Sequence, residues 1–387
     1  MLDRDQTVRL LSALVRAESP DPPGDETRVC AVLAAELRAL GFAPEIEEFA
    51  PGRFNLLVRL RGDGSRPGLV FSAHMDTLPP GEGDWARDPY SGHDDGARVH
   101  GRGTADMKAG LAALVSALTD LARAARDGEA GRGPRLRGDL VLAATGGESS
   151  NCLGARRLVE RRALDGAAGL LVAEPTSLDL VTATTAALWL RVTARGRAGH
   201  GSGGPAGDAE GGANAIAAML EALPGLPALL PAQTHPLLGG ATLSVGRIAG
   251  GTAINLAADR CTAELDLRLP PAADAPALEA AIRARLGPGF TVERLDFKPG
   301  VESPADAPLA AAVLAAAQAE RGRPLAPRGA RYFTDACVLA PAFGLETATL
   351  GPGALGASGA LDESVAVADM LAAARIHAAA ARAMLLD

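Results

Sequence analysis

The chain has 387 residues, enough for two domains, and 48% of them are hydrophobic, so it can bury a large core. A net charge of −8 excludes the basic patch that nucleic acid or an anionic membrane would require. Aromatic residues make up only 3% of the chain, so we expect a core of alanine, leucine and valine.

The four cysteines, Cys30, Cys152, Cys261 and Cys337, are far apart and form no CxxC pair, which is typical of reduced thiols in a cytoplasmic protein. The first residues contain acids and lack the basic-then-apolar order of a signal peptide. Apolar stretches stay below the ~18 residues that a membrane-spanning helix needs. We therefore expect a soluble, cytoplasmic protein.

The first part of the chain alternates between predicted helices and strands. Apolar spacing predicts helices over 5–17, 27–40 and 108–125, another after Cys152, and strands over 43–49, 54–60, 68–74, 139–147 and 169–177. Several of these strands end in polar residues. Strands that alternate with helices predict a mostly parallel sheet with its site at the carboxyl ends of the strands.

From about residue 181 the pattern changes to that of an inserted α+β domain. A strand leads into a turn, and the segments that follow are predicted as a helix at 213–223, strands at 241–249 and 260–269, and a helix at 275–286. We expect the large sheet to resume near 294, followed by helices at 308–321 and 363–385. The predicted division is 1–180 and 294–387 for a catalytic domain and 181–293 for a lid.

Residues 71–110 contain the strongest chemical signal. The strand over 68–74 ends at His74, and Asp76 follows two residues later, which suits a metal ligand and a partner that orients its ring. The later block GRGTADMKAG places Asp106 at the mouth of a helix, where an ionised carboxylate can bind a cation. A hydrogen-bonded loop histidine is the alternative for His74 alone, but the two motifs together favour a metal site.

HMDTLP followed by GRGTADMKAG resembles the zinc-dependent family of acetylornithine deacetylase, succinyl-diaminopimelate desuccinylase, aminoacylase and carboxypeptidase G. The resemblance extends over nearly the whole chain. It implies an α/β fold of the zinc-exopeptidase type, with a mostly parallel mixed sheet and an inserted α+β lid that is usually used for dimerisation.

The family holds two zinc ions that share one carboxylate. Transferred to this sequence, the resemblance implies that His74, Asp106 and Glu174 hold one ion, with Asp76 orienting His74. The family's Asp-Glu-Glu run corresponds to Gly147-Glu148-Ser149 here, so Glu148 falls on the general base.

Both private ligands of the second ion are missing. Ser149 stands at one ligand position and Gly359 at the position of the late histidine. In one interpretation the register slips by one, so that Glu148 is a ligand and no base remains. In another the enzyme is mononuclear, with zinc expected before cobalt or manganese. In a third the metal is weak or absent. Cys152 or Ser358 could replace a missing ligand of the second ion, but no motif spacing supports either residue.

The residues expected to face substrate match the family better than the ligand positions of the second ion do. The resemblance assigns His200, in GRAGHGS, to the carbonyl oxygen in the site of a partner subunit, Asn255 to substrate contact, and Arg268 to a substrate carboxylate. Gly359 is placed on the same substrate-facing surface. A strand-surface ion pair is the alternative for Arg268, and a turn histidine for His200.

We therefore predict a homodimeric, metal-dependent amidohydrolase acting on a small N-acyl amino acid or a dipeptide-like compound. Glu148 would act as base on a water at the metal, and His200 would stabilise the oxyanion. Two alternatives stay open. One is a repurposed, metal-poor member that forms or rearranges a C–N bond on an amino-acid-like substrate; the other is a non-catalytic small-molecule binding protein.

Overall fold

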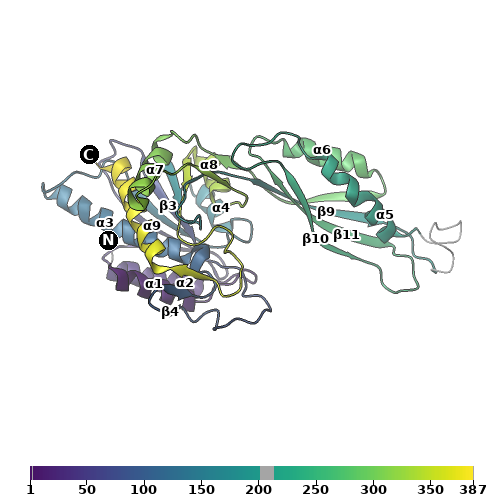
Figure 1. Cartoon of the computed structure of the whole chain (residues 1–387), viewed down its shortest axis with the longest axis horizontal. Coiled ribbons are helices and arrows are strands. Elements are labelled where there is room, and N and C mark those ends of the chain that lie inside the picture. The colour runs from purple at the N-terminus through teal and green to yellow at the C-terminus, as the bar shows by residue number, and fades with distance from the viewer. Residues whose placement is uncertain (2, 201–212, 387) are drawn as a thin grey trace. The chain divides into compact units, whose positions relative to one another are not determined.

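The structure is a computed structural model that describes residues 1, 3–200 and 213–386 (Figure 1). Its α-helices are α1 (Arg4–Arg16), α2 (Thr27–Ala39), α3 (Ala109–Glu129), α4 (Leu153–Glu160), α5 (Ala215–Ala222), α6 (Ala275–Leu286), α7 (Pro308–Arg321), α8 (Ala336–Phe343) and α9 (Val367–Leu385). Its strands are β1 (Glu45–Ala50), β2 (Arg53–Leu60), β3 (Gly68–His74), β4 (His93–Asp94), β5 (Arg98–His100), β6 (Leu140–Thr145), β7 (Ala167–Val172), β8 (Val181–Thr184), β9 (Ala186–Arg195), β10 (Thr242–Gly250), β11 (Arg260–Leu269), β12 (Phe290–Lys298), β13 (Val301–Glu302), β14 (Arg328–Ala330), β15 (Glu346–Thr349) and β16 (Ser364–Ala366).

A large mixed sheet organises the first part of the fold. Its strands lie in the order β1-β2-β6-β3-β7-β15-β8-β13, with β14 beside β8. The central strands β6, β3, β7 and β15 are parallel to one another, and β1 and β2 run antiparallel at one side. Helices cover both faces, since α3 and α9 contact β3 while α4 and α8 contact β2 and β7 (Figure 1). The fold is therefore the predicted α/β type.

Strand β3 shows why the centre of this sheet is stable. Every residue from Gly68 to His74 is buried, as expected for a strand covered on both faces. Leu69, Val70 and Phe71 are each at most 1% exposed. Burial of such side chains contributes roughly 1.5–3 kcal/mol each, so the strand end that presents His74 is firmly anchored.

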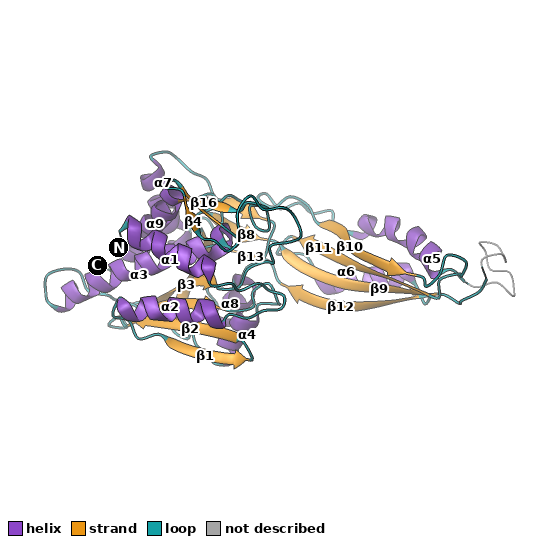
Figure 2. Ribbon diagram, turned by 90° about the horizontal axis from the view of Figure 1, so that it is seen from below, coloured by secondary structure: helices purple, strands orange, loops and turns teal. Residues whose placement is uncertain are grey.

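By its internal contacts the chain divides into two compact units. The first comprises residues 1–182, 302–328 and 334–387, and the second comprises 183–301 and 329–333. In the second unit, α5 and α6 lie along one face of a four-stranded sheet with the order β10-β11-β9-β12 (Figure 2). A continuous apolar cluster, including Leu188, Leu190 and Ile282, fills the space between them.

The strand near residue 294 differs from expectation. We expected the large sheet to resume there, but β12 pairs antiparallel with β9 in the four-stranded sheet. Its apolar residues explain this, because Val292 and Phe297 pack into the core of the second unit. The domain limits of 181 and 293 remain a prediction.

Candidate metal centre

Three neighbouring strands deliver acidic and histidine side chains to one edge of the large sheet. Strand β3 ends at His74, β6 ends just before the segment of Glu148, and β7 ends just before Glu174. Because these strands are parallel and lie in the order β6-β3-β7, their carboxyl ends meet at the same edge. The topology thus gathers residues that lie up to a hundred positions apart in the sequence.

Asp106 reaches the same edge from a turn that precedes α3. Residues Thr104–Lys108 form a short π-helical turn, within which Asp106 has φ −123° and ψ 97°, so its backbone is extended. The regular helix begins only at Ala109. The backbone amides of Ala105 and Asp106 donate to Glu363 Oε1 at 2.8 and 3.2 Å, which fixes the turn.

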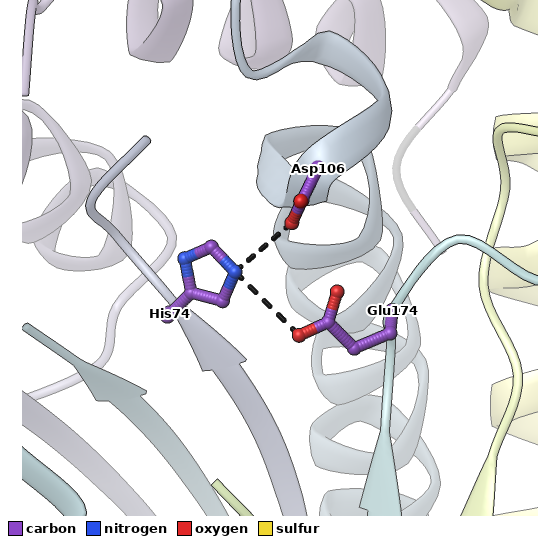
Figure 3. A group of neighbouring side chains, drawn as sticks. All are labelled: His74, Asp106 and Glu174. Carbon is purple, nitrogen blue, oxygen red and sulfur yellow. Dashed lines mark hydrogen bonds and ion pairs between the residues drawn. The ribbon is translucent and has the colours of Figure 1, made fainter. Parts of the chain in front are cut away.

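The side chains of His74, Asp106 and Glu174 converge (Figure 3). His74 Nε2 lies 3.0 Å from Asp106 Oδ1 and 3.5 Å from Glu174 Oε1. One potential ligand atom of each residue lies within 4.8 Å of the others. One imidazole nitrogen and two carboxylate oxygens suit zinc, cobalt or manganese, so these residues fit a divalent cation.

His74 is oriented by its own strand end. Its Nδ1 lies 2.9 Å from the backbone oxygen of Asp76, so Nδ1–H donates there and Nε2 faces the acids. The Asp76 carboxylate stands farther away, at 3.6 Å. It instead accepts hydrogen bonds from the amides of Glu148 and Ser149, both at 3.0 Å. Asp76 therefore connects the histidine strand to the loop of Glu148.

Crowding of acids in a buried place shifts the protonation of these groups. Burial raises the pKa of Glu148 well above its usual range, and the nearby Glu174 carboxylate adds to this. Burial and the Asp106 carboxylate likewise raise the pKa of Glu174. Burial lowers the pKa of His74, but Asp76, Asp106 and Glu174 outweigh it and hold that pKa well above 6.5. A bound cation would relieve the repulsion among these carboxylates.

Ser149 and Gly359 stand where the resemblance places the two private ligands of the family's second ion. Ser149 is bound by its amide to Asp76. Gly359 has φ +77°, where side chains are strained, and a Cβ there would lie 3.3 Å from Leu78 Cδ1. The neighbouring Ser358 hydroxyl hydrogen-bonds to Asp106. Among the described residues, His74, Asp106 and Glu174 form the only group of three possible ligands.

Cys152, considered as a substitute ligand, has another neighbour. Its Sγ lies 3.8 Å from Cys337 Sγ, and both thiols are buried. Cys152 also hydrogen-bonds to Asp335, whose Oδ2 accepts from Thr145 Oγ1 at 2.5 Å. Asp335 is thus hydrogen-bonded to Thr145, the last residue of β6.

Other buried polar residues near the site were not found from the sequence. Lys108 Nζ donates to the carbonyl oxygens of Leu14 and Ala17 at 2.8 and 3.0 Å, which ties the Asp106 turn to the end of α1. Arg53 forms a buried bidentate pair with Asp21. Lys108 belongs to the GRGTADMKAG motif, but its partners are backbone oxygens, which sequence patterns do not reveal.

The expected substrate-facing residues His200, Asn255 and Arg268 belong to the second unit. His200 forms an antiparallel bridge with Leu256, next to Asn255, and both His200 and Asn255 are exposed. Arg268 Nε donates to Asp266 at 3.0 Å. The segment after His200, residues 201–212, lies outside the described residues. The roles of these three residues toward the metal cluster remain predictions.

No described helix has the length and apolar character that crossing a membrane would need. The cytoplasmic location stays a prediction.

The sequence resembles known enzymes over most of its length. The acetylornithine deacetylase of Proteus mirabilis is 31% identical over 328 residues, which cover 79% of each protein. That of Edwardsiella ictaluri is 31% identical over 349 residues, covering 85% of this chain and 83% of that one. A probable succinyl-diaminopimelate desuccinylase of Staphylococcus epidermidis is 32% identical over 52% of this chain and 47% of that protein.

Solved structures agree on the fold. The M20 family metallo-carboxypeptidase Sso-CP2 of Sulfolobus solfataricus superposes with a TM-score of 0.80 at 15% identity, covering 97% of this chain and 98% of that one. The aminopeptidase PepT of Bacillus cereus gives 0.74 at 21% identity, over 99% of both chains. The model of peptidase family M20/M25/M40 matches residues 70–383. The chain therefore belongs to peptidase family M20/M25/M40 and is an amidohydrolase.

Proposed function

We propose that this chain hydrolyses the amide bond of a small N-acyl amino acid or a dipeptide-like compound with a single divalent cation, zinc before cobalt or manganese. The observation that supports this most is the meeting of His74, Asp106 and Glu174 at the edge that also receives the Glu148 loop. The deacetylase relatives support an N-acyl amino acid as the substrate class.

The cation, when bound by these three residues, would supply a Lewis acid that polarises the reacting groups. Glu148 would take the proton from the attacking water and return it to the leaving amine. The Asp76 carboxylate holds Glu148 in place because it accepts hydrogen bonds from the backbone amides of Glu148 and Ser149. His74 keeps Nε2 turned toward the acids because Nδ1 is bound to a backbone oxygen.

We assign the second unit the recognition of substrate. Arg268 uses Nε for Asp266, which leaves its outer guanidinium nitrogens for a substrate carboxylate. His200 would donate to the oxyanion that forms at the carbonyl in the site of a partner subunit, and Asn255 and Gly359 would contact the substrate. These roles rest on the resemblance of their motifs to the family.

We also propose a homodimer through the second unit. Strand β10 lies at an edge of the four-stranded sheet, and Val245 and Ile248 on it are 41% and 47% exposed. An edge strand with exposed apolar residues is a template for pairing with another chain. Pairing of β10 with its copy would cover these side chains.

The test is metal content together with hydrolysis. Protein purified without chelator should bind about one zinc, cobalt or manganese ion per chain, and should release acetate from N-acetylornithine or another N-acetyl amino acid. The His74→Ala variant should lose both the ion and the activity. Two ions per chain would contradict the mononuclear site. An ion without turnover over a broad panel of N-acyl amino acids and dipeptides would favour the binding-protein or repurposed alternatives.

A further inference from the structure

The loop between β6 and α4 holds Glu148 and is fixed from two sides. On one side Asp76 accepts from the amides of Glu148 and Ser149. On the other side the Ser150 hydroxyl donates to Asp21 Oδ1 at 2.7 Å, across 129 residues of sequence. The second attachment is made by a side chain rather than by the backbone, so it can be removed by a single substitution.

Asp21 is itself held by a buried arginine. Arg53 Nη1 and Nη2 donate to its two carboxylate oxygens at 3.0 and 3.1 Å, a bidentate pair that fixes both position and orientation. Arg53 Nη1 also donates to Glu26 Oε1 at 2.7 Å. The side chains of Arg53, Asp21 and Glu26 are only 11%, 1% and 0% exposed.

The backbone is shaped around this arginine. A Cβ at Gly24 would lie 1.9 Å from Arg53 Nη2, and φ at Gly24 is +82°, so only glycine lets the chain approach the guanidinium. In the loop of Glu148, a Cβ at Gly147 would lie 3.3 Å from Arg53 Nη1. Arg53 thus contacts both the segment of Asp21 and the loop of Glu148.

The segment of Asp21 is also bonded to the end of β3. The amide of Asp21 donates to the Thr77 oxygen at 2.8 Å, and the amide of Thr77 donates to the Ser19 oxygen at 2.9 Å. The Ser19 hydroxyl donates to the Met75 oxygen at 2.7 Å. Residues 19–21 therefore join the strand end that presents His74 to the loop that presents Glu148.

A buried cluster of one arginine and two carboxylates is a poor source of stability, because removing charges from water offsets much of their attraction. Its geometric effect is more specific, since it fixes two catalytic segments relative to each other. We propose that Asp21 and Arg53 are positioning residues that act through Ser150 to hold Glu148 against the His74 cluster. The catalytic part of this inference rests on the proposed function.

The decisive variant is Ser150→Ala, which removes one hydroxyl and leaves the buried ion cluster intact. We expect kcat on N-acetylornithine, or on the N-acyl amino acid that is hydrolysed fastest, to fall about tenfold with KM changed less than about twofold, because the base is displaced while the substrate contacts remain. Metal content should stay the same. Ser150→Thr, which keeps the hydroxyl, should restore most of kcat.

Hydrogen exchange of the metal-loaded protein tests the network without any turnover. Exchange of the Glu148 and Ser149 amides should become about fivefold faster in Ser150→Ala, because the loop loses the hydrogen bonds of this hydroxyl to Asp21 and from Arg53. Arg53→Met should give a larger increase. Arg59→Met, which removes a cation from the same strand β2, should leave these two amides unchanged.

Unchanged exchange at residues 148 and 149 in Ser150→Ala would overturn the network, and faster exchange with unchanged kcat would overturn its positioning role. If Arg53→Met does not fold, Ser150→Ala still decides the question. If the wild-type protein hydrolyses none of the substrates, the proposed function fails, whereas the exchange rates continue to report on the network.

Discussion

Arg102 and Glu363 form an ion pair in which Nη1 and Oε2 are 2.5 Å apart and the two side chains are 2% and 1% exposed. The second oxygen of Glu363 accepts from the amides of Ala105 and Asp106. Arg102 Nη2 donates to the carbonyl oxygen of Gly359 at 3.2 Å. The pair thus fastens the late loop that contains Gly359 to the turn that presents Asp106.

Replacing Glu363 should destabilise the fold strongly. Glu363→Gln leaves the Arg102 charge buried without a counter-charge, and we expect the free energy of unfolding to fall by about 3–5 kcal/mol in urea titrations. Glu320→Gln is the matched control, because Glu320 pairs with Arg375, whose side chain is 46% exposed. The control should cost less than about 1 kcal/mol. Equal losses of unfolding free energy in the two variants would contradict a stabilising role of the buried Arg102–Glu363 pair.

Glu148→Gln tests the general base. The amide cannot accept the proton, so kcat should fall about 10²–10⁴-fold while metal content and the unfolding midpoint stay near those of the wild type. Glu160→Gln on α4 is a suitable control, since its side chain is 65% exposed and pairs with Arg157. Wild-type turnover by Glu148→Gln, measured as acetate release, would remove this residue from the mechanism.

The main features of the fold could be predicted because local patterns determine them. The apolar run that ends at His74 is a fully buried strand, and the long alanine-rich stretch at the C-terminus is α9. Alternation of strands and helices predicted parallel central strands. Strand order then gathered His74 and Glu174, whose positions in the sequence the family motifs had already marked.

What could not be predicted depends on contacts between distant segments. Arg53 meets Asp21 across 32 residues, and Glu363 meets the amide of Asp106 across 257. Neither pair belongs to a periodic pattern, and a charged residue in a sequence gives no sign of being buried. The pairing of β12 with β9 is similar, because the apolar pattern of a strand does not say which sheet it joins until Val292 and Phe297 pack into the core of the second unit.

Restoring a second ion should require more than restoring its ligands. Ser149→Glu supplies a carboxylate at an ordinary backbone position, whereas Gly359→His places a side chain at φ +77° and costs roughly 1 kcal/mol or more. We expect Gly359→His alone to keep about one ion per chain and to lower the unfolding midpoint. Metal analysis of the single and double variants at equal free zinc checks this. Two ions in Gly359→His alone would contradict it.

The proposed dimer can be tested at the edge of the four-stranded sheet. Ile248→Lys introduces a charge on β10 at a side chain that is 47% exposed, and we expect it to convert the dimer to a monomer in sedimentation or light-scattering measurements. Ile46→Lys is the control, because Ile46 is 37% exposed on β1, at an edge of the large sheet. A monomeric wild-type protein, or dissociation by both variants, would contradict an interface at β10.

Acid should destabilise this protein partly through His377 on α9. The side chain is 0% exposed, and Nε2–H donates to the Leu350 oxygen at 2.8 Å. Burial lowers its pKa from 6.5 to about 4. Between these values the unfolded chain binds a proton that the folded chain does not, so stability present above pH 6.5 is lost as the pH falls to 4.

The shift of the His377 pKa corresponds to about 3 kcal/mol over the full window and about 2 kcal/mol between pH 7 and pH 5. His377→Gln keeps a donor for the Leu350 oxygen but does not titrate there. The free energy of unfolding of the wild type should therefore fall by about 2 kcal/mol more than that of the variant between pH 7 and pH 5, in urea titrations at both pH values. A difference between the two proteins that stays constant with pH would show that the folded protein accommodates the charged imidazole.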